Sequence, residues 1–145
     1  MMFWDASAII PLCLDEPQTK VIRNISGQDG AIVAWWGSTI ECYSAFARLR
    51  RERLLNNREE EQLRNVLNML SGSWTEIKPS QDIRNLAARL LLLHPLRAAD
   101  SLQLAAALVW AEKSPKRHGF VCLDNRLKEA ANKEGFALLP SEEEE

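Results

Sequence analysis

The chain has 145 residues, of which 46% are hydrophobic and 26% are charged, and its formal net charge is −2. A chain of this length fits one domain, and a domain near this size buries roughly 70% of the surface that its unfolded chain exposes. The composition excludes disordered, collagen-like and disulfide-scaffold proteins and predicts a folded globular domain. We assign residues 1–140 to this domain and expect the acidic residues 141–145 to be a disordered tail.

Three cysteines, Cys13, Cys42 and Cys122, form an odd set without a C-x-x-C pair or a histidine cluster. This pattern argues against a disulfide framework and a zinc site, so we expect reduced thiols in the core. Residues 1–10 lack the basic segment of a signal peptide, and no apolar run approaches the roughly 18 residues that span a bilayer. We therefore expect a cytoplasmic protein that does not associate with membranes.

The net charge lacks the electrostatic footprint of a typical nucleic-acid binder, because counterion release needs clustered lysine and arginine. Basic residues do cluster locally, within residues 48–58 and 113–118. The net charge thus neither supports nor excludes RNA binding, and the local runs say more, although most runs of this kind are solvated helix faces.

The first half of the chain alternates short apolar runs with segments of helical periodicity. The expected elements, in chain order, are a strand at residues 1–4, a helix at 7–14, a strand at 31–36 and a helix from 39 to about 55. Pro11 in the first of these helices is tolerable only near the first turn. Ser38 and Glu41 match a capping box at the start of the next helix.

The second half of the chain continues this alternation. The expected elements are a helix from 57 to about 70, a strand at 74–77, a helix from 81 to about 93, a helix from 98 to 112, a strand at 120–123, a helix at 126–133 and a strand at 136–139. Asn57 and Ser80 are the expected caps of the first two of these helices. Strands that alternate with helices are joined by right-handed crossovers, so the sequence predicts a three-layer α/β/α fold with a mainly parallel central sheet.

Four acidic residues lie at the ends of predicted strands or at the starts of predicted helices. Asp5 follows the first strand, Glu41 opens the helix after the second, Asp100 opens the penultimate helix, and Asp124 follows the penultimate strand. Each has an alternative explanation, because acids at helix N-termini cap the helix and interact favourably with its dipole. In an open parallel sheet, however, sites form beyond the carboxyl ends of the strands, where these carboxylates are expected to converge.

Four like charges at one sheet edge repel each other until they are protonated or bind cations. Oxygen ligands without Cys or His favour a hard ion, so Mg²⁺ or Mn²⁺ is the expected cofactor. Such ions activate a water and stabilise the charge that develops in phosphodiester cleavage, and the acids would then be ligands and not nucleophiles. Ser7 is a candidate to hydrogen-bond a ligand carboxylate or a bound phosphate, although it is equally suited to an ordinary helix cap.

The segments around the four acids resemble the motifs of the PIN-domain ribonuclease family, in the same order along the chain. They are residues 3–8, FWDASA; residues 39–45, TIECYSA; residues 97–105, RAADSLQLA; and residues 121–127, VCLDNRL. The resemblance spans nearly the whole chain. It departs from the family pattern at Ala6, where many relatives carry Thr, and at Cys122, where a Thr or Ser often precedes the fourth acid.

The resemblance implies a Mg²⁺- or Mn²⁺-dependent endoribonuclease whose metal ligands are Asp5, Glu41, Asp100 and Asp124. Single-domain members of this size are typically VapC-type toxins of toxin–antitoxin pairs, so the resemblance also implies an antitoxin partner. RNA contacts are then expected from the arginine-rich helix, from Arg97 or from Arg126 near the site. We further expect a homodimer in which apolar helix faces pack together.

Other proteins that gather acids at a sheet edge fit less well. A receiver domain resembles an acidic pair after the first strand, and an aspartyl phosphatase pairs its first Asp with an acid two positions on, where Ser7 stands. The remaining alternative is a PIN-like module that binds RNA or protein without turnover, against which four intact acids argue. We expect Trp35, Trp36 and Trp110 to pack in the core or a dimer interface rather than to stack on bases.

Overall fold

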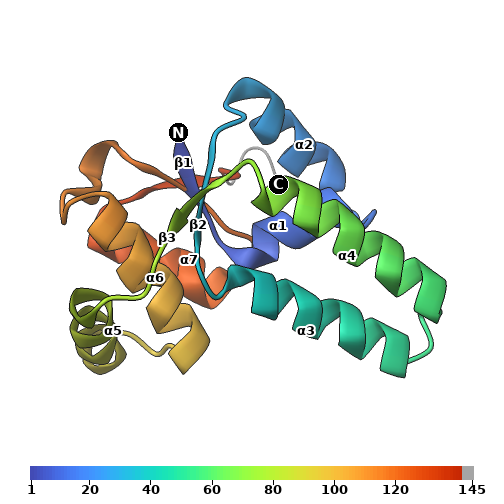
Figure 1. Ribbon diagram of the computed structural model, residues 1–145. Coiled ribbons are helices and arrows are strands. Elements are labelled where there is room, and N and C mark those ends of the chain that lie inside the picture. The colour runs from blue at the N-terminus through green and yellow to red at the C-terminus, as the bar shows by residue number, and fades with distance from the viewer. Residues whose placement is uncertain (142–145) are drawn as a thin grey trace.

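A central sheet organises the fold in the computed structural model, which describes residues 1–141 (Figure 1). Five short strands lie in the order β3-β2-β1-β4-β5, and each neighbouring pair is parallel. Their bounds are β1 Met2–Trp4, β2 Ile32–Trp35, β3 Thr75–Ile77, β4 Gly119–Val121 and β5 Ala137–Leu139. The chain runs outward from β1 through β2 to β3 and then returns to the other side of β1, so the strand order reverses between β1 and β4.

Seven helices of the described chain cover both faces of this sheet (Figure 1). Their bounds are α1 Ala6–Cys13, α2 Thr19–Gln28, α3 Ser38–Arg51, α4 Asn57–Ser71, α5 Gln81–Leu93, α6 Ala98–Trp110 and α7 Asn125–Glu134, with a 3₁₀ turn at Pro115–Arg117. No helix within residues 1–141 is long and apolar enough to cross a bilayer. Of the predicted tail, all but Ser141 lies outside the described residues.

Two hydrophobic cores lie on opposite faces of the sheet, because successive side chains of a strand point to opposite sides. Phe3 belongs to the core beneath α5, α6 and α7, whereas its neighbour Trp4 belongs to the core beneath α1 to α4. Phe120 and Val121 on β4 divide in the same way. This arrangement confirms the predicted three-layer α/β/α architecture.

One helix, α2, was not predicted from the sequence, and Pro11 lies further into α1 than expected. The N-cap residue of α2, Gln18, makes no side-chain capping bond, so the helix lacks the start signal on which prediction depends. Its apolar face is nevertheless clear, because Ile22 and Ile25 are buried in the core beneath α1 to α4, and α2 packs against α1. Pro11 lies in the interior of α1 and not in its first turn. It is buried, and its carbonyl accepts a hydrogen bond of 2.9 Å from Thr19 Oγ1, which ties α1 to the start of α2.

The tryptophans also divide between the core and the surface. Trp35 is buried and Trp110 packs against the core beneath α5 to α7. Trp36 is 52% exposed and therefore does not pack in the core of the single chain, so its packing in a dimer interface stays a prediction.

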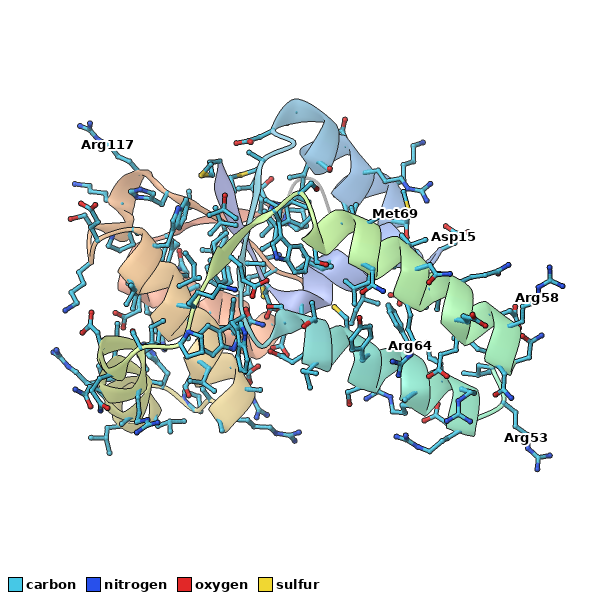
Figure 2. The ribbon with its side chains drawn as sticks, viewed as in Figure 1. Asp15, Arg53, Arg58, Arg64, Met69 and Arg117 are labelled. Carbon is cyan, nitrogen blue, oxygen red and sulfur yellow. The ribbon has the colours of Figure 1, made fainter. Side chains whose placement is uncertain are left out.

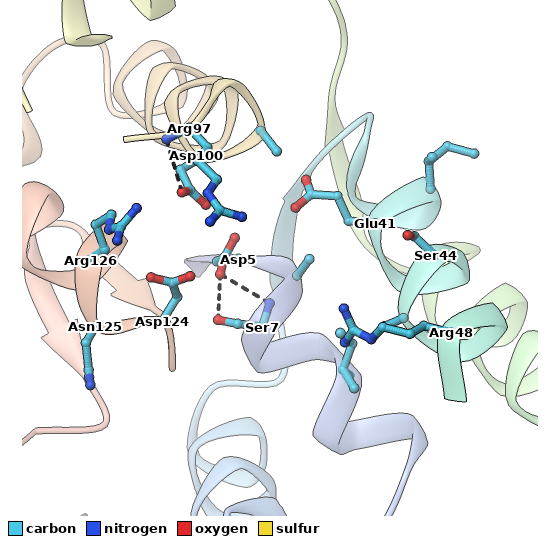
Figure 3. A pocket seen from close by; sticks show the side chains of 15 residues that line it. Asp5, Ser7, Glu41, Ser44, Arg48, Arg97, Asp100, Asp124, Asn125 and Arg126 are labelled. Carbon is cyan, nitrogen blue, oxygen red and sulfur yellow. Dashed lines mark hydrogen bonds between the residues drawn. The ribbon is translucent and has the colours of Figure 1, made fainter. Parts of the chain in front are cut away.

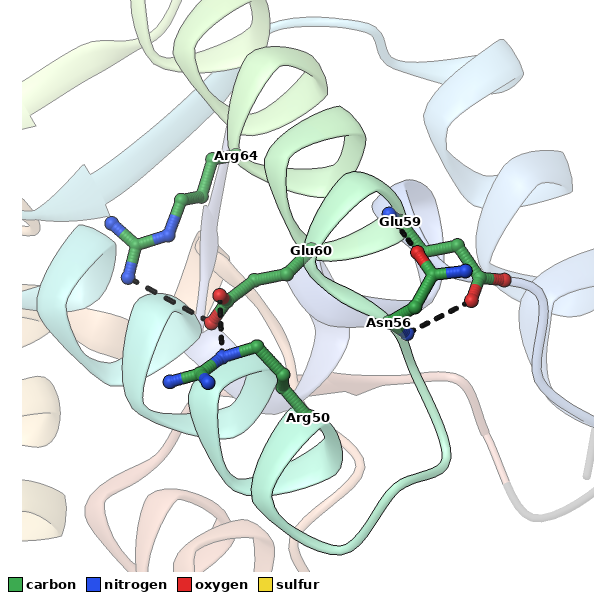
Figure 4. Close-up of polar contacts among 5 residues, drawn as sticks. All are labelled: Arg50, Asn56, Glu59, Glu60 and Arg64. Carbon is green, nitrogen blue, oxygen red and sulfur yellow. Dashed lines mark hydrogen bonds and ion pairs between the residues drawn. The ribbon is translucent and has the colours of Figure 1, made fainter.

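The capping box of α4 uses a different residue from the one predicted (Figure 4). The cap is Asn56, whose Oδ1 accepts a hydrogen bond of 2.8 Å from the backbone N–H of Glu59. The Glu59 carboxylate in turn accepts one of 2.9 Å from the backbone N–H of Asn56. The predicted cap, Asn57, is the first residue inside the helix.

This difference gives a direct test of the start of α4. Asn56→Ala is expected to lower the free energy of unfolding by about 1 kcal/mol, because the N–H of Glu59 loses its acceptor. Asn57→Ala should change it by no more than a few tenths of a kcal/mol, since position 57 is exposed and helical. Urea unfolding of both variants measures the difference, and equal losses would show that Asn56 is not the cap.

Candidate active site

The four predicted acids line one open pocket at the carboxyl ends of β1 and β4, where the strand order reverses (Figure 3). Such reversal points are where open α/β sheets bind ligands, because adjacent loops diverge there. The pocket has a volume of about 960 Å³. The predicted site residues that line it are Asp5, Ser7, Glu41, Arg97, Asp100, Asp124 and Arg126.

Asp5 is the buried acid of the pocket, and its position is fixed by Ser7. Asp5 Oδ2 accepts hydrogen bonds from Ser7 Oγ at 2.5 Å and from the Ser7 backbone N–H at 3.1 Å. The Ser7 hydroxyl also accepts a hydrogen bond of 2.9 Å from the backbone N–H of Leu123, which joins the start of α1 to the chain after β4. Burial raises the pKa of Asp5 to about 6, even though the hydrogen bonds from Ser7 lower it.

The role of Ser7 can be tested without a substrate. Ser7→Ala is expected to lower the free energy of unfolding by about 1–3 kcal/mol, because Leu123 N–H loses its acceptor and Asp5 loses a donor. It should also raise the pKa of Asp5 further, since a hydrogen bond to the charged form is lost. Chemical denaturation at pH 7 measures the first effect, with Ser73→Ala, which removes a surface hydroxyl, as the matched control. A Ser7→Ala loss no larger than that of the control would contradict this role.

Glu41 and Ser38 do not form the predicted capping box. The N-cap of α3 is Gly37, which offers no side chain, and Ser38 is buried. Both side chains instead contact Gln103 of α6, whose Nε2 donates to Ser38 Oγ at 2.9 Å and to Glu41 Oε2 at 2.7 Å. The prediction failed because a tertiary partner, 62 residues away, takes the place of the local cap.

The pKa of Glu41 is raised, as is that of Asp5. Burial is the largest cause and the charge of Asp5 the next, and together they raise the pKa of Glu41 to about 7. The hydrogen bond from Gln103 opposes this rise. Gln103 was not predicted as a site residue, although it is a polar residue in an apolar stretch, one turn after Asp100 and therefore on the same face of α6.

Asp100 and Asp124 complete the set on the other side of Asp5 (Figure 3). Asp124 Oδ1 accepts a hydrogen bond of 3.1 Å from the backbone N–H of Leu127 and thereby caps α7. Burial raises the pKa of Asp100, and the charge of Asp124 raises it further. The charges of Arg126 and Arg97, the two predicted substrate contacts, lower it.

Helix capping and a site role are therefore compatible for Asp5 and Asp124. Capping uses Oδ2 of Asp5 and Oδ1 of Asp124. Their second oxygens, Asp5 Oδ1 and Asp124 Oδ2, have no hydrogen-bond donor within residues 1–141. One oxygen of each carboxylate thus remains available to a ligand in the pocket.

The donor set fits a hard divalent cation that keeps part of its water shell. Asp5 raises the pKa of Glu41, Asp100 raises those of Asp5 and Glu41, and Asp124 raises that of Asp100, so the four acids share one electrostatic environment. Within the described chain, no three His, Cys, Asp or Glu side chains already stand together as a metal-binding group. Mg²⁺ commonly retains several waters and takes only one or two carboxylates directly, so a Mg²⁺ site does not require three acids in contact.

The sequence matches no protein-family model and no curated protein, but solved structures share its fold. VapC20 from Mycobacterium tuberculosis, described as a sarcin-ricin loop cleaving toxin, has 15% identity and a TM-score of 0.68, over 94% of this chain and 97% of that chain. FitAcB from Neisseria gonorrhoeae has 15% identity and a TM-score of 0.64, over 95% and 96%. A toxin–antitoxin complex from Klebsiella pneumoniae has 14% identity and a TM-score of 0.61, over 87% and 88%.

These similarities establish the fold class over almost the full length of the chain. At such identities they concern the backbone, and the chain has the three-layer α/β/α PIN-like fold that the sequence predicts. The sheet is entirely parallel within residues 1–141, slightly more regular than the mainly parallel sheet expected.

Proposed function

We propose that this chain is a Mg²⁺- or Mn²⁺-dependent endoribonuclease of the PIN-domain family and the toxin of a type II toxin–antitoxin pair. The observation that carries the proposal is the convergence of Asp5, Glu41, Asp100 and Asp124 on one pocket at the reversal point of the sheet. The similarity to VapC20, described as a toxin that cleaves the sarcin-ricin loop, supports RNA as the substrate.

The four acids would hold the cation, and neighbouring side chains orient Asp5 and Glu41. A divalent ion bound there supplies an activated water and neutralises the charge that develops on the cleaved phosphodiester. Ser7 orients Asp5 by its two hydrogen bonds, and Gln103 holds one oxygen of Glu41. Arg97 and Arg126 place positive charge beside Asp100, where a phosphate of the substrate would approach.

Two protein partners belong to the proposal. Toxin–antitoxin complexes among the structures of the same fold support an antitoxin, whose basic side chain would suit the acidic pocket.

A second copy of this chain would cover Leu91, Leu92 and Leu93 at the end of α5, which are 44%, 87% and 57% exposed. Light scattering of the wild type and Leu92→Lys tests the homodimer, since a monomeric wild type would exclude it.

The nuclease proposal is tested by incubating the purified protein with a mixed RNA pool in Mg²⁺, in Mn²⁺ and in EDTA. We expect cleavage with either metal, none in EDTA, and recovery when Mg²⁺ is added back. Cleavage that continues in EDTA would contradict metal dependence. Binding of the RNA without cleavage under any condition would favour the alternative, a catalytically silent PIN-like binding module.

A further inference from the structure

The arginine-rich stretch of residues 48–58 is not one basic surface. Arg50 forms a salt bridge with Glu60 of α4, in which Nε lies 2.9 Å from Oε1 (Figure 4). Arg53 and Arg58 lie at the far end of the α3–α4 hairpin, remote from the acidic pocket (Figure 2). Arg53 is also where α3 has ended, with a φ of 63°. Most arginines of this stretch therefore contribute no positive charge to the lining of the pocket.

Arg48 is the member of the stretch that lines the acidic pocket. It lies seven residues after Glu41 on α3, which is close to two helical turns, so the two side chains share one face of the helix. Ser44, which also lines the pocket, occupies the turn between them. The face of α3 that begins with a proposed metal ligand thus ends with a cation, about 10 Å further along the helix axis.

The charge of Arg48 is available to a ligand. Its side chain is exposed, and within residues 1–141 it forms no salt bridge. Figure 3 shows it between α3 and α1, across Asp5 from Arg126. Arg97 and Arg126 stand on the α6 and α7 side, where their charges act on Asp100. The pocket therefore has acids in its middle and an arginine on each of two sides.

We propose that Arg48 binds a backbone phosphate of the RNA one or two nucleotides from the cut, on the side of the pocket opposite to Arg97 and Arg126. The strand then crosses the four acids from α6 and α7 towards α1 and α3, and Arg48 fixes its path. A guanidinium group is suited to this role because it stays charged and presents several donors to phosphate oxygens. This inference rests on the proposed ribonuclease function.

The test measures binding of a fluorescein-labelled, mixed-sequence, single-stranded 12-nucleotide RNA in Mg²⁺ at several salt concentrations. The parent protein carries Asp5→Asn so that the probe survives. Arg48→Ala should weaken binding on the order of three- to tenfold and lower the slope of log affinity against log salt by about 0.7, as expected for one lost phosphate contact. Arg48→Lys should restore most of both. Arg51→Ala is the matched control, an exposed arginine of the same helix that does not line the pocket.

A second readout uses the active protein. With Asp5 intact, Arg48→Ala should raise KM and leave kcat nearly unchanged, because Arg48 contacts the strand away from the cut. Equal affinities and salt slopes for the Arg48→Ala and Arg51→Ala proteins would overturn the inference. So would a parent protein that does not bind the probe. In either case, RNA cleavage by the wild type would show that the ribonuclease proposal holds and that only the role of Arg48 is wrong. No cleavage would mean that both proposals are wrong.

Discussion

Replacing Asp5 with asparagine is expected to lower RNA cleavage at least about 100-fold, because the pocket loses the charge of its most buried proposed metal ligand. The same change should leave the folded protein at least as stable at pH 8. Asp5 is almost fully buried, and burial disfavours its charged form strongly enough to raise its pKa to about 6. Asparagine keeps the side-chain oxygen that accepts from Ser7 and carries no charge to bury.

The matched control for this variant is Asp15→Asn, which removes an exposed acid between α1 and α2 (Figure 2). It should change neither cleavage nor stability beyond a few tenths of a kcal/mol. Cleavage rates with Mg²⁺ and urea unfolding at pH 8 are compared for the three proteins. Full activity in Asp5→Asn would refute the proposed role of this residue, and a large loss of stability would mean that Asp5 acts mainly in folding.

The metal-free protein is expected to lose stability as the pH rises from about 4 to about 7. The pKa of Asp5 in the folded protein is raised from 3.8 to about 6, and that of Glu41 from 4.5 to about 7. The folded state therefore holds protons that the unfolded state has released, and its advantage disappears as the pH passes through the folded pKa values. For the fully buried Asp5, the shift corresponds to roughly 3 kcal/mol.

Saturating Mg²⁺ should offset this loss, because a cation stabilises the charged carboxylates of the folded state. We expect a small increase in the free energy of unfolding at pH 5 and a larger one at pH 8. Urea unfolding in EDTA and in Mg²⁺ across this range measures both. Asp5→Asn should show a flatter pH profile and a smaller response to Mg²⁺. A wild-type profile that rises between pH 4 and 7 in EDTA would contradict the burial of uncompensated acids.

The fold was predictable because it depends on local patterns that the chain repeats. Alternation of apolar strands with amphipathic helices specifies a parallel sheet between two helical layers, and adjacent residues such as Phe3 and Trp4 fill the two cores. The helix that escaped prediction, α2, lacks a capping residue at its start. Its apolar residues are buried where α2 packs against α1, and the sequence alone does not show that contact.

The acids of the site were predictable for a related reason. The carboxyl ends of parallel strands lie at one edge of the sheet, so Asp5 and Asp124 were expected at the same edge, and the pairing of β1 with β4 brings them into one pocket. Cys122 stands where the PIN-domain pattern often has Thr or Ser, and its thiol takes a similar place beside the acids. Its buried thiol lies 3.6 Å from Asp5 Oδ2 and donates to the Asp124 carbonyl at 3.4 Å, so it remains a weak donor beside the acids.

The supporting residues could not be predicted, because their partners are distant in sequence. Gln103 acts on Glu41 across 62 residues, which requires α6 to pack beside the start of α3. Arg48 differs from its arginine neighbours in the direction that its side chain takes from α3, and that direction depends on where α1 and α4 pack. Sequence spacing identified the charged groups, whereas packing decides which of them meet.

The most direct test of the account is the position of a bound metal. Crystals of the wild type grown with saturating Mn²⁺ are examined for anomalous scattering from the ion. We expect one strong peak, or two close together, within the pocket among Asp5, Glu41, Asp100 and Asp124. A pocket without a peak, in a preparation that cleaves RNA with Mn²⁺, would contradict the claim that these acids hold the catalytic ion.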